Sequence, residues 1–245
     1  MKNSNDIVAD VSRAGNRIRG WHRRHYSFKE MIVKGASAHH NLAAMQKSLS
    51  RSSAFTLIEL LVVIAIIAIL IGLLFPAFRA VQNQAKQTQA KNDLTQIVNA
   101  VNAFYTDYGK YPLVTVDTTY GPAGTANNPL FNVLRAQDTT NNPRQIVFIN
   151  PPYVKTPANP RSGIATQATT INGISVAIND YVDPWGTPYN VEIDGGYDNQ
   201  LTNPYTANTG AGPSPLAIGV IAWSWGRDQA QGTNFNASDD VISWQ

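Results

Sequence analysis

The chain has 245 residues, which suits one membrane-anchored domain or two small ones, and a formal net charge of +3. It contains no cysteine, which excludes a disulfide framework, thiolate metal sites and a cysteine nucleophile. The charge is uneven, because residues 1–54 hold ten Lys and Arg against three Asp and Glu, whereas residues 55–245 have a net charge of −4. All four His precede residue 55, so the remainder lacks the commonest general base.

Residues 1–54 are polar and basic and show no apolar periodicity, which predicts a leader rather than a folded domain. Met45 offers a later start of translation, which would leave residues 1–44 outside the protein and 45–54 as a short leader. The high isoelectric point therefore describes this leader, and the basic composition does not predict nucleic-acid binding by the rest of the chain.

Residues 55–75 form an apolar run with one charge, Glu59. A helix of roughly 20 such residues is long enough to cross the ~30 Å hydrocarbon core of a membrane. The basic residues lie before the run, so the positive-inside rule places the N-terminus in the cytoplasm and the C-terminal bulk outside. We therefore expect a single-pass protein of the inner membrane, with residues 55–76 as the transmembrane helix.

Residues 77–108 continue the helix in a different pattern, with apolar side chains at three- and four-residue steps and polar ones between them. Gly109 and Pro112 predict where the helix ends. Gly72 and Pro76 lie near the junction of the two patterns and could bend the helix there.

Beyond residue 111 the apolar runs are short and Pro, Gly, Asn and Thr are frequent. The pattern predicts a short helix at 130–134 after an Asn127–Asn128 cap and a long loop at 195–215. Short strands are predicted at 146–149, 174–178, 189–193, 216–225 and 241–244. The expected fold is α+β: a long N-terminal helix packed on a small antiparallel sheet, with residues 77–245 forming an extracytoplasmic domain.

Glu59 is the unusual residue of the apolar run, since a carboxylate inside a membrane helix is costly and usually functional. Cleavage between Ala54 and Phe55 would create an α-amine at Phe55. This amine and the Glu59 carboxylate of a neighbouring subunit could neutralise one another and set the axial stagger of a filament. The alternative is a signal anchor that tolerates one Glu near its end.

Residues 55–76 closely resemble the signal segment of type IV prepilins and type II secretion pseudopilins. The resemblance implies that prepilin peptidase cuts before Phe55 on the cytoplasmic side and N-methylates it. It also implies assembly into a homo-oligomeric filament by a cytoplasmic ATPase and an inner-membrane platform protein. The family normally has Gly before the cut, where this chain has Ala54, another small residue.

Three further segments resemble the major pseudopilin: 103–112 its helix end, 183–189 the start of a strand, and 224–228 with 239–244 its C-terminal loop. They favour a pseudopilin over a classical pilin, which usually ends in a Cys-bridged loop. Residues 113–182 are longer than the resemblance predicts and match it poorly. In the major pseudopilins the C-terminal loop holds calcium, which here implies Asp228, Asp239, Asp240 and Ser243 as oxygen ligands. The alternative is a solvated acidic turn.

The expected function is that of a structural subunit of a type II secretion pseudopilus or type IV pilus-like filament, not an enzyme. A minor pilin for adhesion or DNA uptake is the alternative, although the charge of −4 on residues 55–245 disfavours DNA and no nucleic-acid partner is expected. A carboxylate glycosidase is disfavoured because Asp239 and Asp240 are adjacent and would point to opposite faces of a strand.

Overall fold

The computed structural model describes residues 55–245, which form one unit. The predictions for residues 1–54, including the leader, the start at Met45 and Ala54, lie outside the described residues. Phe55, the first described residue, is 73% exposed.

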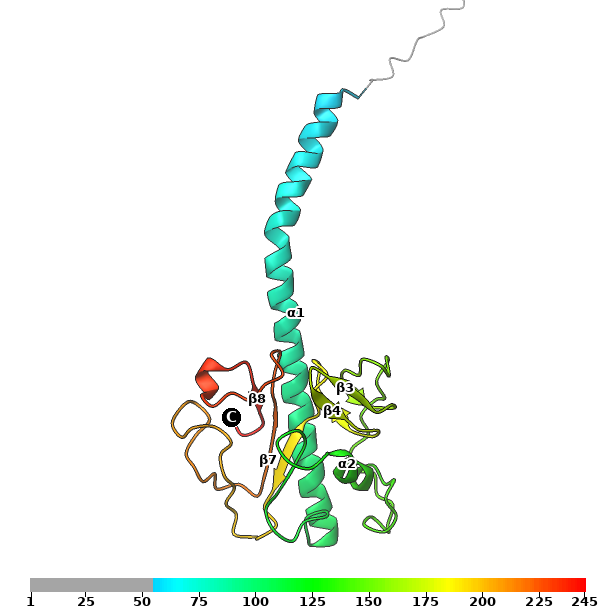
Figure 1. Ribbon diagram of the computed structural model, residues 1–245, viewed down its shortest axis with the longest axis vertical. Coiled ribbons are helices and arrows are strands. Elements are labelled where there is room, and N and C mark those ends of the chain that lie inside the picture. The colour runs from blue at the N-terminus through cyan, green and yellow to red at the C-terminus, as the bar shows by residue number, and fades with distance from the viewer. Residues whose placement is uncertain (1–54) are drawn as a thin grey trace, which may run out of the picture. The chain divides into compact units, whose positions relative to one another are not determined.

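Helix α1 (Leu57–Tyr108) is one helix of 52 residues that bows in its first half (Figure 1). It begins after Thr56, whose side chain caps it, and it ends at Gly109. Gly109 adopts a left-handed conformation with φ 68°, and its N–H donates to the carbonyl of Tyr105 at 2.8 Å. This termination is favourable for glycine because it has no Cβ to clash, and it confirms the predicted end of the helix.

The two halves of α1 differ in burial, as their sequence patterns predict. Its apolar first half is exposed along its length and is long and apolar enough to cross a membrane. The second half buries one stripe against the rest of the protein, formed by Ala90, Leu94, Ile97, Ala100, Val101 and Phe104. Pro76 lies within the helix, between the two halves. The first half therefore needs lipid or other helices around it.

The main sheet is antiparallel, with strand order β1-β6-β7-β8. Its strands are β1 (Thr118–Tyr120), β6 (Asn190–Ile193), β7 (Val220–Ser224) and β8 (Val241–Ile242). The register places Val191 opposite Ala222 and Trp223 opposite Ile242. Figure 1 shows β7 alongside the second half of α1, so the observed α+β architecture is the predicted one.

Smaller elements surround this sheet on both sides of α1 (Figure 1). Two short hairpins pair β2 (Gly163–Ile164) with β5 (Tyr181–Val182) and β3 (Thr169–Ile171) with β4 (Ile174–Val176). The remaining helices are α2 (Asn128–Leu134) and the 3₁₀ helix η1 (Phe235–Ala237).

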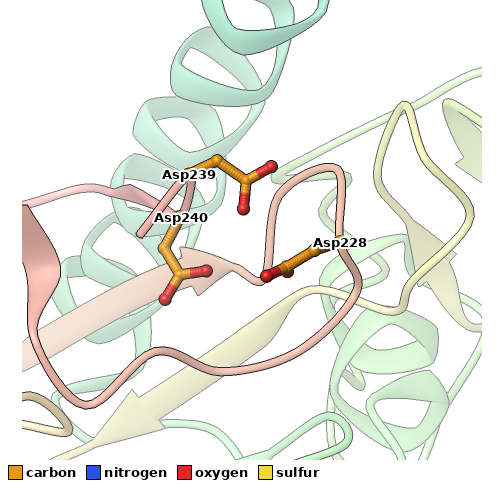
Figure 2. Close-up of side chains that lie close together, drawn as sticks. All are labelled: Asp228, Asp239 and Asp240. Carbon is orange, nitrogen blue, oxygen red and sulfur yellow. The ribbon is translucent and has the colours of Figure 1, made fainter. Parts of the chain in front are cut away.

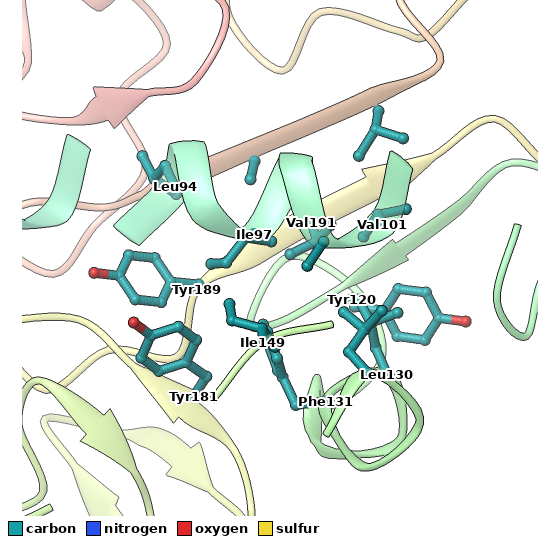
Figure 3. Close-up of a cluster of buried hydrophobic side chains, with 14 of the residues drawn as sticks. Leu94, Ile97, Val101, Tyr120, Leu130, Phe131, Ile149, Tyr181, Tyr189 and Val191 are labelled. Carbon is teal, nitrogen blue, oxygen red and sulfur yellow. The ribbon is translucent and has the colours of Figure 1, made fainter. Parts of the chain in front are cut away.

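The core lies between α1, the main sheet and α2 (Figure 3). From α1 it contains Leu94, Ile97 and Val101, and from β6 it contains Val191 and Ile193. Because side chains alternate along a strand, the two β6 residues share the face toward the helix. Full burial of each such side chain stabilises the fold by about 1.5–3 kcal/mol. A second apolar cluster, which includes Trp223, Leu201 and Leu216, packs the predicted loop 195–215 against the sheet.

Two local predictions differ from the structure. Asn127 makes no side-chain cap to α2; its amide group instead donates to the carbonyls of Tyr181 and Tyr189 at 3.1 and 2.8 Å. Residues 146–149 are not a strand, and Phe148 N–H donates to the carbonyl of Leu134 at 2.9 Å. Ile149 joins the core and Phe148 packs against it, whereas Val147 is 57% exposed.

Candidate functional site

The start of α1 holds Phe55 and Glu59, the two described residues that the sequence assigns to processing and assembly. Glu59 Oε2 accepts hydrogen bonds from Thr56 N–H at 2.8 Å and from the Thr56 hydroxyl at 2.7 Å. Thr56 Oγ1 in turn accepts from Glu59 N–H at 3.2 Å. The arrangement is a capping box, which satisfies backbone N–H groups that the first turn of a helix leaves free.

The capping box was missed at the sequence level, although Thr and Glu three residues apart at a helix start are its usual signature. It holds the Glu59 carboxylate beside the backbone of residue 56, one residue from the position where cleavage would create an amine. Both bonds go to Oε2, and Oε1 makes no hydrogen bond among the described residues. The carboxylate therefore retains an oxygen that could accept a hydrogen bond from another subunit.

The second candidate site lies where β7 ends and β8 begins. Carboxylate oxygens of Asp228, Asp239 and Asp240 lie within 4.8 Å of one another, and Figure 2 shows the three side chains converging. The sheet creates this proximity: Asp228 follows β7, whereas the other two precede β8, and the two strands are paired. Gly226, with φ 65°, closes the intervening turn, where a Cβ would collide with the carbonyl of Asp239.

Backbone N–H groups hold each of the three carboxylates. Ala230 N–H donates to Asp228 Oδ1 at 3.0 Å, Arg227 N–H to Asp239 Oδ2 at 2.7 Å, and Gly232 N–H to Asp240 Oδ2 at 3.0 Å. Burial raises the pKa of the Asp240 carboxyl, and the negative charges of Asp228 and Asp239 raise it further. Such a cluster gains stability from a cation that offsets the repulsion.

Asp240 Oδ1 is buried and accepts no hydrogen bond of normal geometry among the described residues, although the Tyr205 hydroxyl lies near enough to the Asp240 carboxyl to lower its pKa. A buried carboxylate oxygen without a partner is unfavourable, and a metal ion is one group that could satisfy it. The residues present fit calcium, which prefers several carboxylate and carbonyl oxygens, better than they fit zinc, which prefers His and Cys.

Ser243 was predicted as a fourth ligand and lies just beyond β8. Its Oγ accepts a hydrogen bond from Ala222 N–H at 2.9 Å, and its N–H donates to the Ala222 carbonyl at 2.9 Å. These bonds extend the pairing of β7 with the C-terminal segment. The hydroxyl thus has a structural partner in the sheet, and its role as a ligand stays a prediction.

Asp183 opens the 183–189 segment that resembles the major pseudopilin, but its role as a buried hydrogen-bond acceptor was not predicted from the sequence. Its Oδ1 accepts from the N–H groups of Trp185, Gly186 and Thr187 at 2.8, 2.7 and 2.9 Å. Its Oδ2 accepts from the Ser224 hydroxyl, at the end of β7. Burial raises the pKa of Asp183 to about 6 despite these donors. The carboxylate therefore ties the 183–187 turn to the strand that leads into Asp228.

Comparison with known families matches residues 49–75 to the prokaryotic N-terminal methylation motif. The matched range contains Phe55, Thr56 and Glu59 and nearly all of the exposed apolar half of α1. The comparisons with curated proteins and with solved structures both give no match.

Proposed function

We propose that this chain, which carries the signature of type IV pilins and pseudopilins, is a structural subunit of a type II secretion pseudopilus or a related filament. One observation supports the proposal above the others. The methylation motif opens a helix whose first half is apolar and exposed and whose second half is the core of a folded domain. Such a subunit can exchange lipid for neighbouring helices without refolding its domain.

Prepilin peptidase would cut between Ala54 and Phe55 and methylate the new amine. Ala54 meets the steric need for a small residue before the cut. Cleavage would leave a positive charge at Phe55, and the Glu59 carboxylate of a neighbour would neutralise it in the dry core of the filament. The unbonded Glu59 Oε1 supports this role, since the capping box need not break for the pair to form.

Membrane insertion would precede assembly. The basic residues before the helix favour an orientation in the inner membrane with the folded domain outside the cytoplasm. An assembly ATPase and a polytopic platform protein would then move the subunit into the filament. The features that favour a pseudopilin over a classical pilin are the cysteine-free chain and the acidic C-terminal loop.

Calcium is the proposed ligand of the acidic loop, held by Asp228, Asp239 and Asp240. The convergent carboxylates and the unpartnered Asp240 oxygen support it. The ion would fix the loop between β7 and β8 and so stabilise the C-terminal edge of the sheet.

The N-terminus of the chain tests the proposal directly. The full chain is expressed in cells with and without prepilin peptidase, and its N-terminal peptide is identified by mass spectrometry. We expect N-methylated Phe55 only when the peptidase is present. An unprocessed chain, or a cut after residue 75, would refute the proposal and indicate an ordinary signal anchor or secretory signal.

A further inference from the structure

Four cationic side chains line one groove of about 450 Å³ between α1 and the folded domain. Arg79 and Lys86 lie on α1, seven residues apart and therefore on the same face, while Arg161 and Arg227 come from the domain. Trp185 and Gln229 also line the groove, and Gln229 Nε2 donates to the carbonyl of Trp185 at 2.9 Å. The groove thus joins segments far apart in the chain into one basic surface.

These cations have no acidic partners among residues 55–245. Among the described residues, Arg144 forms an ion pair with Asp107, and the four groove cations form no ion pair. Their side chains also make no hydrogen bonds to other described residues, and three of the four residues are exposed. This concentration of positive charge is notable because residues 55–245 carry a net charge of −4. An anion in the groove would meet cations that are free to bind it.

The groove continues toward the apolar half of α1. A neighbouring hollow is lined by Phe75 and Pro76 at the apolar end and shares Arg79 and Arg227 with the first. Arg79 is four residues beyond Phe75, which places it about 6 Å farther along the helix axis. The polar headgroup layer on each side of a bilayer is about 5–8 Å thick. If residues 55–75 span the hydrocarbon core, Arg79 therefore lies at the depth of lipid phosphates.

We propose that this groove binds the headgroup of an anionic phospholipid, with the phosphate between Arg79 and Arg227 and the glycerol end toward Phe75 and Pro76. The groove and the neighbouring hollow together match both parts of such a lipid, since the groove is cationic and the hollow adds Phe75 and Pro76 beside the shared Arg79 and Arg227. A zwitterionic lipid fits less well, because its ammonium group would enter the basic region. The inference rests on membrane anchoring by residues 55–75 and is independent of which filament the subunit serves.

The carboxylates of the acidic loop oppose this binding from nearby, and one of them, Asp228, directly follows Arg227 in the chain. Asp239 accepts the Arg227 N–H at 2.7 Å, so the acidic loop lies beside Arg227. A test must therefore keep the calcium concentration constant in all samples.

Native mass spectrometry of the full chain in an uncharged detergent tests the proposal. The chain is titrated with phosphatidylglycerol or phosphatidylcholine in the same calcium-containing buffer. The groove variant is R79Q/R227Q, and the matched control is K110Q/K155Q, which removes the same charge at two exposed positions outside the groove. The basic leader is present in every variant, so its own binding to anionic lipid cancels in the comparison.

We expect the preference for phosphatidylglycerol over phosphatidylcholine to be about fivefold greater in the wild type and the control variant than in the groove variant, which keeps only the contribution of the leader. R79K/R227K keeps the charge and should keep the preference, which separates lost binding from lost folding. Equal preference in the groove and control variants would overturn the proposal. Displacement of the lipid by an equimolar amount of inorganic phosphate would also overturn it, because the groove would then be a general anion site. Loss of self-association in the groove variant, without a change in lipid binding, would also overturn it and would assign the groove to contact with a second copy of the chain.

These outcomes are separable from those for the proposed function. Processing at Phe55 concerns the start of α1 and is measured without added lipid. A chain that is processed but shows no lipid preference would refute only the groove assignment.

Discussion

The Glu59 carboxylate accepts hydrogen bonds from both the backbone N–H and the hydroxyl group of Thr56, at 2.8 and 2.7 Å. The contact is local, so a single subunit can satisfy this carboxylate before it meets another copy. It also fixes where the carboxylate lies relative to Phe55. The residue proposed for assembly therefore has a second role, as a helix cap, and a mutation there changes both.

Glu59→Val separates processing from assembly. The variant keeps the apolar character of the segment and the residues at the cut, so we expect normal conversion to a chain that begins at Phe55. It lacks the charge that would offset the neighbour's amine in a low-dielectric core, so we expect filaments to be strongly reduced. Electron microscopy and sedimentation of sheared filaments would measure assembly, and mass spectrometry would measure processing.

Thr56→Ala is the control for the capping role of Glu59. It removes the side-chain cap at a cost of about 1 kcal/mol in local helix stability but leaves the carboxylate in place. We expect filaments to persist. If Thr56→Ala abolished assembly as completely as Glu59→Val, the helix cap rather than the charge pair would explain the loss.

Ile97→Ala should destabilise the folded domain by about 2–5 kcal/mol, because it leaves a cavity where α1 meets the sheet. Ile97 has no exposed surface, whereas Val116 is 66% exposed. Val116→Ala therefore removes methyl groups with little effect and serves as the control. Urea unfolding of the full chain in detergent, followed by tryptophan fluorescence, would measure both. Similar losses in the two variants would contradict the assigned core.

Asp183 predicts a specific pH dependence of stability. Its folded pKa is about 6, above the roughly 3.9 expected of an unfolded Asp, so the unfolded chain releases this proton first as pH rises. The contribution of Asp183 to the free energy of unfolding should thus be highest below pH 4, fall between pH 4 and 6, and level off above. The predicted fall is about 3 kcal/mol.

Asp183→Asn removes this titration but keeps an oxygen that can accept the three backbone N–H bonds. The difference between the unfolding free energies of wild type and variant should therefore decline from pH 4 to pH 7. Glu192, whose pKa burial raises to about 7, titrates in both proteins and cancels. Asp198→Asn, at an exposed position, is the matched control. A wild-type curve parallel to that of Asp183→Asn would contradict the assignment.

Calcium should raise the thermal midpoint of the wild-type chain, and a chelator should reverse the change, because only the folded loop brings the three carboxylates together. Asp239→Asn removes one charged ligand and should weaken binding by at least tenfold in calorimetric titration. Asp198→Asn makes the same chemical change outside the cluster and should bind as wild type does. Absence of binding heat in the wild type, or equal affinity in Asp239→Asn, would exclude the calcium site.

The sequence pattern and the family resemblance predicted those structural features that depend on residues close together in the chain. The helix and its end at Gly109 follow from repeating apolar positions and a residue that tolerates positive φ. The convergence of Asp228 with Asp239 was expected only from resemblance, since it depends on the pairing of β7 with β8.

Apart from the local capping box of Thr56 and Glu59, the features that were missed depend on residues distant in the chain. Asp183 and Ser224 are 41 residues apart, and no local sequence pattern predicts the hydrogen bond between them. The basic groove likewise assembles Arg79, Arg161 and Arg227 from three segments, each unremarkable alone. The strand predicted at 146–149 is wrong because only Ile149 of these apolar residues is buried, Val147 is 57% exposed, and the segment has no strand partner among the described residues.

The exposed apolar half of α1 restricts the environments through which the subunit can pass. Its large side chains between Leu57 and Phe75 are 46–81% exposed, and moving them together from hydrocarbon into water would cost tens of kcal/mol. For the filament subunit proposed above, a chain that leaves the bilayer would therefore have to pass directly into the polymer, with no free aqueous intermediate between the two. On the same proposal, growth would occur at the membrane surface, and a subunit lost from the base of a filament would return to the bilayer and be available for reuse.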